Sequence, residues 1–75
     1  MDVVLTQEFL GEEEEADLVS WAVEDGSNVN KGDVICQLET SKLVSDFEAP
    51  ATGRITFKAE EGDVVNVNEV LATIE

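Results

Sequence analysis

Glu39-Thr40-Ser41-Lys42-Leu43 lies near the middle of the chain, between two runs in which apolar and polar residues alternate. The run 34–39 enters this stretch, and the run 44–48 leaves it. Alternation with a period of two is typical of half-buried strands, and small polar residues between two such runs predict a tight hairpin turn. We therefore expect Lys42 at or beside the tip of a β-hairpin, with its amine in water.

The rest of the chain also favours strands, because turn residues interrupt short apolar runs throughout. No convincing run has helical spacing. The segment Gln7 to Glu15 contains four consecutive acids that repel one another, so we predict a surface loop there, with room for a short helix turn at most. Pro50 belongs at a strand end or edge. The further strand candidates are residues 2–6, 18–23, a brief piece around 29, 54–59, 64–66 and 70–74.

The second half of the chain repeats the first at an offset of 36 residues, which places Trp21 on Phe57 and Cys36 on Ala72. A repeat of this size predicts an all-β fold, a flattened barrel or sandwich built from two equal halves, about 1–39 and 43–75. The hairpin that joins the halves should lie at one end and both termini at the other. The acidic loop is extra to the repeat, which makes it either a functional insertion or a tolerated one.

The composition limits the class of protein. A chain of 75 residues makes one domain, 1–75, and we expect it to be monomeric. A net charge of −14 argues against nucleic acid and anionic membranes and favours partners with basic surfaces, although acids can also simply keep a domain soluble. One cysteine cannot form an internal disulfide, and no apolar span or secretory leader is present. We expect a cytoplasmic protein, or a mitochondrial matrix protein in a eukaryote.

Few residues could carry chemistry. The absence of histidine excludes His-based triads and His metal sites. Cys36 alternates in phase with Val34 and Leu38 and is most simply a small core residue. Trp21 and Phe57 are also expected in the core. Lys42 remains, and an exposed lysine held between two strands is either ordinary solvated surface or an attachment point for a cofactor.

The residues around Lys42 resemble the lipoyl domain of 2-oxo acid dehydrogenase acyltransferases. The resemblance rests on Glu39 to Leu43, then Glu48-Ala49-Pro50 and Gly53, and on the two repeated turns 24–26 and 60–63. It implies two four-stranded antiparallel sheets with quasi-two-fold symmetry, and lipoic acid in amide linkage on Lys42. The family usually has Asp where Ser41 stands, and a Pro and a glycine-rich acidic loop after the first strand. Biotin carriers share the fold but usually flank the lysine with methionines, so Ser41 and Leu43 count against biotin.

The resemblance also implies a mechanism in which the domain itself does no catalysis. A lipoate ligase or lipoyl transferase would load Lys42, which would then serve as a swinging arm. The arm would visit a thiamin-diphosphate decarboxylase, an acyltransferase core and a dihydrolipoyl dehydrogenase. Acetoin-type or branched-chain systems fit slightly better than pyruvate systems. The alternatives are a biotin carrier and an unmodified docking or spacing module. Partners are expected to recognise the residues of the hairpin and of the acidic loop: Glu39, Thr40, Ser41, Leu43, Glu12, Glu13, Glu14 and Glu15.

Overall fold

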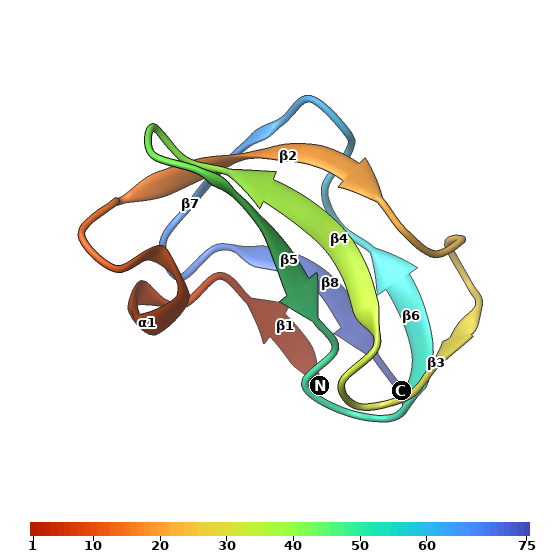
Figure 1. Ribbon diagram of the computed structural model, residues 1–75. Coiled ribbons are helices and arrows are strands. Elements are labelled where there is room, and N and C mark those ends of the chain that lie inside the picture. The colour runs from red at the N-terminus through yellow and green to blue at the C-terminus, as the bar shows by residue number, and fades with distance from the viewer.

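Two antiparallel four-stranded sheets pack face to face in the computed structural model, which describes residues 1–75 (Figure 1). The strand orders are β1-β8-β6-β3 and β5-β4-β2-β7. The molecule measures 30 × 21 × 17 Å, so the expected flattened all-β architecture is confirmed. The elements are β1 (Asp2–Val4), α1 (Gln7–Leu10), β2 (Glu15–Trp21), β3 (Asn28–Val29), β4 (Val34–Glu39), β5 (Val44–Glu48), β6 (Gly53–Phe57), β7 (Val64–Asn66) and β8 (Val70–Ile74).

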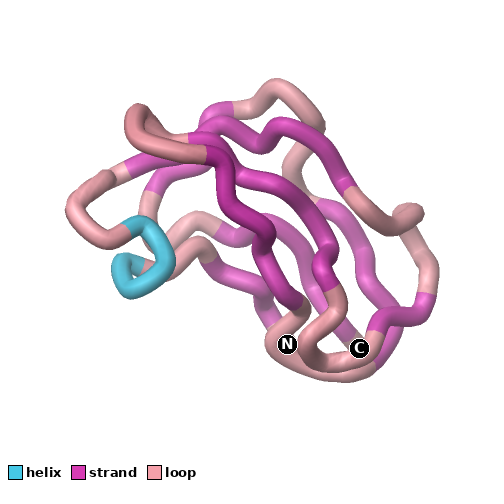
Figure 2. The backbone as a smooth tube through the Cα atoms, viewed as in Figure 1, coloured by secondary structure: helices cyan, strands magenta, loops and turns pink.

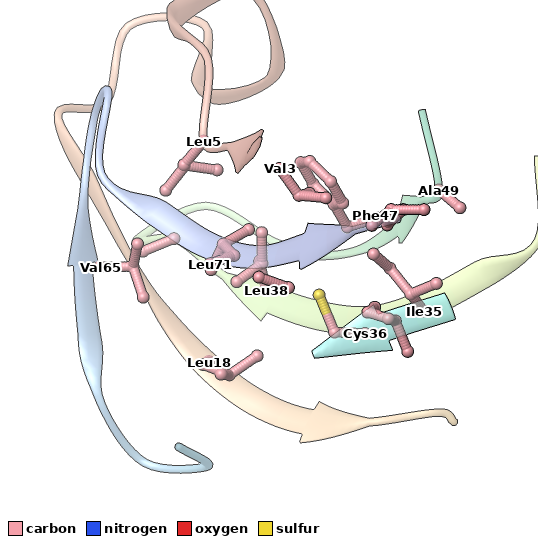
Figure 3. Close-up of a cluster of buried hydrophobic side chains, with 14 of the residues drawn as sticks. Val3, Leu5, Leu18, Ile35, Cys36, Leu38, Phe47, Ala49, Val65 and Leu71 are labelled. Atoms are coloured by element: carbon pink, nitrogen blue, oxygen red, sulfur yellow. The ribbon is translucent and has the colours of Figure 1, made fainter. Parts of the chain in front are cut away.

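The core lies between the sheets and is entirely apolar (Figure 3). Alternate side chains are buried along much of the sheets, with consecutive buried pairs in β4 and β8, and no polar or charged residue is buried. Burying one large aliphatic side chain contributes about 1.5–3 kcal/mol, so a few such residues offset much of the entropy cost of a small domain. The largest fully buried side chains are Leu5, Leu18, Ile35, Leu38, Ile55 and Leu71.

The repeat appears in the structure as reciprocal contacts between the halves. The backbone N–H of Trp21 donates to Glu61 Oε2 over 2.9 Å, and the backbone N–H of Phe57 donates to Asp25 Oδ1 over 2.8 Å. Asp25 and Glu61 are themselves 36 positions apart, as Trp21 and Phe57 are. The two aromatic rings stack on each other, with centroids 3.8 Å apart and planes 8° apart. Each half therefore completes the other, and the quasi-two-fold symmetry is confirmed.

The bounds of four strands, β4, β5, β7 and β8, agree with the sequence prediction, and the others shift. The largest shift is in β2, which begins at Glu15 instead of residue 18 and ends at Trp21 instead of residue 23. Its first residues pair with β7, where Glu15 faces Asn66 and Asp17 faces Val64. The ladder hydrogen bonds outweigh the repulsion between neighbouring acids in this segment. Two other strands also differ from the prediction. β1 ends at Val4 instead of residue 6, and β6 runs from Gly53 to Phe57 instead of from residue 54 to residue 59.

The segment predicted as a loop, Gln7 to Glu15, contains a helix turn, and this corrects the prediction in part (Figure 2). Thr6 caps the turn, because its Oγ1 accepts the Phe9 N–H over 3.2 Å. Leu10 is buried, and the Phe9 ring packs edge-on against Phe47 of β5 with centroids 4.9 Å apart. A four-residue helix is marginal alone, so these tertiary contacts stabilise it.

Two expectations about the core were wrong in detail. Val34 is not in phase with Cys36, because a bulge between them interrupts the pairing of β4 with β5. Ile35 and Cys36 are both buried, whereas Val34 is 37% exposed. Trp21 and Phe57 pack against the core but are only half-buried, and their outer surfaces border a hollow.

Both chain ends lie at the end of the barrel opposite the β4–β5 turn (Figure 1). The amine of Met1 donates to the carbonyl oxygen of Ile74 over 2.7 Å. Pro50 lies just beyond the end of β5, as expected. No helix of the structure is long and apolar enough to span a bilayer.

Candidate functional site

The turn between β4 and β5 is closed by its own backbone and by one hydroxyl. Glu39 and Val44 form the last pair of the ladder. The Thr40 N–H donates to the Leu43 carbonyl oxygen over 2.9 Å. Thr40 Oγ1 also accepts the N–H groups of Lys42 and Leu43, over 3.3 and 3.4 Å. Ser41 and Lys42 are thus the two central residues, and Lys42 lies at the tip, as the sequence predicts.

Lys42 projects from the tip into solvent. Its side chain is 65% exposed, and its Nζ lies 3.3 Å from Glu12 Oε2. Such an exposed ion pair contributes at most about 1 kcal/mol, so it leaves the amine accessible. Glu12 is the one hydrogen-bond partner of the amine within the domain. The turn therefore has the geometry of an attachment point.

The acidic segment that follows α1 folds back onto this turn. Ser41 Oγ donates to Glu13 Oε1, and Glu12 pairs with Lys42. Gln7 Nε2 donates to the carbonyl oxygens of Gly11 and Glu13, over 2.8 and 2.9 Å, and these two bonds restrain the backbone of the segment. The predicted hairpin residues and the predicted acidic residues therefore form one surface, although about 30 positions separate them in the chain.

The predicted recognition residues differ in how close they lie to Lys42. Glu13, Glu15 and Glu39 border a carboxylate-lined hollow beside the turn, with Thr40 and Ser41. Leu43 is 57% exposed next to Lys42. The Glu14 side chain is exposed, does not line this hollow and makes no hydrogen bond or ion pair within the domain. Whether partners recognise any of these residues stays a prediction.

Two residues of this surface were not predicted. Asp17 borders the hollow because the β2–β4 register places it opposite Glu39. Gln7 acts through backbone carbonyls, which leaves no signal in the sequence. The register of β2 could have revealed Asp17, had the strand been predicted to start at Glu15.

Other kinds of site find little support among the remaining side chains. Cys36 is fully buried, and burial raises the pKa of its thiol from 9.0 to about 12. A buried neutral thiol is a poor nucleophile. No group of three or more acidic, Cys or His side chains is arranged to hold a metal ion.

A barrel of two symmetric halves that holds a lysine out at the tip of the joining hairpin is the architecture of a swinging-arm carrier domain. The chain belongs to the biotinyl/lipoyl attachment family, whose model, described as "Biotin-requiring enzyme", matches residues 9–75. Its fold is that of a lipoyl domain. The lipoyl domain of the 2-oxoglutarate dehydrogenase complex from Azotobacter vinelandii superimposes with a TM-score of 0.78 at 26% identity, over 100% of this chain and 95% of that one.

The curated relatives that match belong to two different enzyme systems. The lipoamide acyltransferase component of the branched-chain alpha-keto acid dehydrogenase complex from Bacillus subtilis is 36% identical over 73 residues, which is 95% of this chain and 17% of the relative. A probable glycine cleavage system H protein from Thermococcus gammatolerans is 44% identical over 46 residues, which is 61% of this chain and 28% of the relative. The chain thus spans less than a third of either relative.

Proposed function

We propose that this chain is a lipoyl carrier domain and that Lys42 carries lipoic acid in amide linkage. The observation that carries the proposal is the placement of an exposed lysine at the tip of the hairpin that joins the two halves. The family membership and the match to a lipoyl domain support it. The strands on either side of the turn fix the position of the lysine backbone, and the side chain remains free to move.

The Lys42 amine would attack the carboxyl carbon of an activated lipoate. The ammonium first releases one proton to the solvent, which frees the lone pair for the attack. An amide bond then forms, the bond to the activating group breaks, and the nitrogen releases a second proton, so that it ends without charge. When attached, the lipoyl group supplies a disulfide that accepts an acyl group together with two electrons. The domain contributes position and a high local concentration of the arm. The ion pair of Lys42 with Glu12 is lost in the process, since an amide carries no charge.

We further propose that the carrier serves a 2-oxo acid dehydrogenase complex of the branched-chain or acetoin type. The Bacillus relative supports the branched-chain assignment. The parent chain would then be an acyltransferase, and its partners a thiamin-diphosphate decarboxylase, an acyltransferase core and a dihydrolipoyl dehydrogenase. The net charge of −14 favours basic docking surfaces on these partners. The domain would work in a reducing compartment, which is the cytoplasm or, in a eukaryote, the mitochondrial matrix.

A second candidate function is a carrier of the glycine cleavage system, which the identity to the Thermococcus relative favours. Both candidates load the same lysine, so the reaction that follows loading separates them. The loaded chain would be acylated by a 2-oxo acid decarboxylase with its substrate in the first case. It would be charged only by the glycine-cleaving component in the second.

Mass spectrometry after incubation with a lipoate ligase, lipoate and ATP tests the proposal. We expect the mass to rise by one lipoyl group, and Lys42→Arg to abolish the gain. Lys58→Arg is the matched control, because Lys58 is a second exposed lysine and its loss should change nothing. Incubation with a biotin ligase followed by avidin blotting tests the biotin alternative. If no ligase modifies the chain, the unmodified docking module becomes the better reading.

A further inference from the structure

The acidic segment contacts the two central residues of the lysine turn in two different ways. Glu12 contacts the Lys42 amine, which loses its charge once the lysine is acylated. Glu13 contacts the Ser41 hydroxyl, which acylation of Lys42 leaves unchanged. The first contact is specific to the unmodified chain, and the second is available both before and after modification.

The Glu13 contact comes from a segment that is anchored on the barrel. Leu10 is buried at the end of α1, and the Phe9 ring packs on Phe47. Gln7 Nε2 donates to the carbonyl oxygen of Glu13 itself, over 2.9 Å. Among the four consecutive acids, Glu13 alone is partly buried, while Glu12, Glu14 and Glu15 are exposed. Glu13 is therefore anchored through its backbone and partly shielded from water, whereas the Glu12 side chain makes only its exposed ion pair with Lys42.

Few other hydrogen bonds restrain the centre of the lysine turn. Its remaining hydrogen bonds all run through Thr40, on the β4 side. Ser41 forms its one side-chain hydrogen bond with Glu13, which ties the centre of the turn to a second element. A bond from an anchored carboxylate to a turn hydroxyl reduces the number of conformations that the turn can adopt.

We propose that Glu13 and Ser41 are positioning residues for the modification of Lys42. This inference rests on the proposed function and goes beyond it. The Glu13–Ser41 contact holds the turn in the conformation that presents Lys42 to the modifying enzyme. Glu12 does not contribute in this way, because its ion pair with Lys42 must break before the amine can react.

The predicted effect falls on the binding of the chain by the enzyme. Loss of one charge-assisted hydrogen bond at the surface lowers the equilibrium constant for the correctly shaped turn by about three- to tenfold. The apparent KM for the chain rises by up to the same factor, since only the competent fraction binds. The kcat stays unchanged, because the amine that reacts is the same once the chain is bound.

The experiment measures kcat and KM for this chain with a lipoate ligase, lipoate and ATP. The variants are Glu13→Ala and Ser41→Ala, and each should raise KM, by at most about three- to tenfold. Glu24→Ala is the matched control: it removes the same charge from an exposed residue outside the predicted recognition surface, whose side chain makes no hydrogen bond or ion pair. Ser41→Thr keeps the hydroxyl and should restore the wild-type KM. The double variant Glu13→Ala with Ser41→Ala should be no worse than either single variant.

The outcomes distinguish failure of this inference from failure of the proposed function. If the wild-type chain is not modified at all, the proposed function is wrong. If the wild type is modified and both alanine variants match Glu24→Ala, the positioning role is refuted. A change in kcat at constant KM, or no rescue by threonine, refutes it as well. Faster hydrogen exchange at the Lys42 and Leu43 amides in folded Ser41→Ala is the independent check, and unchanged exchange contradicts the inference.

Discussion

Gly53 begins β6 beside the C-terminal end of β8, where the backbone of β6 passes close to Ile74 and Glu75, and its replacement by alanine should be costly. Its φ angle is +156°, and an added Cβ would lie 2.8 Å from Ile74 Cγ2 and closer still to the carbonyl oxygen of Glu75. That oxygen accepts the Arg54 N–H over 2.9 Å, so it cannot move away without breaking the ladder. The clash is thus with backbone that other bonds hold in place.

The magnitude follows from two terms. Inserting a methyl group into a packed site costs about 1–3 kcal/mol, and backbone strain adds about 1 kcal/mol. We expect Gly53→Ala to lower the free energy of unfolding by about 2–4 kcal/mol. A domain of this length has about 4–11 kcal/mol in all, and each kcal/mol corresponds to about 4–8 °C in Tm. The variant should therefore melt at least about 8 °C below the wild type.

Gly32→Ala is the matched control. Its φ angle is +95°, and nothing lies within 4 Å of an added Cβ. It carries strain without a clash, and we expect a loss of about 1 kcal/mol. Urea unfolding followed by the fluorescence of Trp21, the one tryptophan, gives both free energies. Losses that agree within about 0.5 kcal/mol, the scatter of additive sites, would refute the steric argument.

Two further predictions concern buried and reciprocal groups. Because burial raises the pKa of the Cys36 thiol from 9.0 to about 12, the unfolded chain releases this proton first, and stability should fall as pH rises from about 9 to 12. The free energy of unfolding should fall by about 1.4 kcal/mol per pH unit, the value for one proton. In urea unfolding at several pH values, Cys36→Ala should remove this contribution to the slope. Asp25→Ala and Glu61→Ala each remove one of the two equivalent bonds to a backbone N–H, so each should cost about 1 kcal/mol. Costs that differ by more than about twofold in thermal unfolding would argue against equivalent halves.

Much of the fold could be predicted from the sequence because the repeat and the alternation are local signals. The strands on either side of the lysine turn were predicted with their observed bounds, since turn residues mark both ends of each. The partial burial of Trp21 and Phe57 could not be predicted. An offset of 36 identifies the two residues as equivalent but does not say which side of the sheet they cover.

The candidate site was predicted in its parts but not as an assembly. The sequence indicates Lys42 at a tip and a run of acids elsewhere, and both are observed. The contacts of Glu12 with Lys42 and of Glu13 with Ser41 depend on the short helix turn before them. That turn is stabilised by the Phe9–Phe47 contact across the chain, and single-residue propensities carry no information about such a contact.

The position of the two chain ends determines how the domain responds to mechanical tension. The amine of Met1 is bonded to Ile74, and the neighbouring strands β1 and β8 run in opposite directions. A force that separates the ends therefore opens the β1–β8 hydrogen bonds one after another, as in a zipper, and never loads them all at once. A weak force applied to the two chain ends would thus separate β1 from β8. The hairpin with Lys42, at the opposite end of the barrel, bears none of that force.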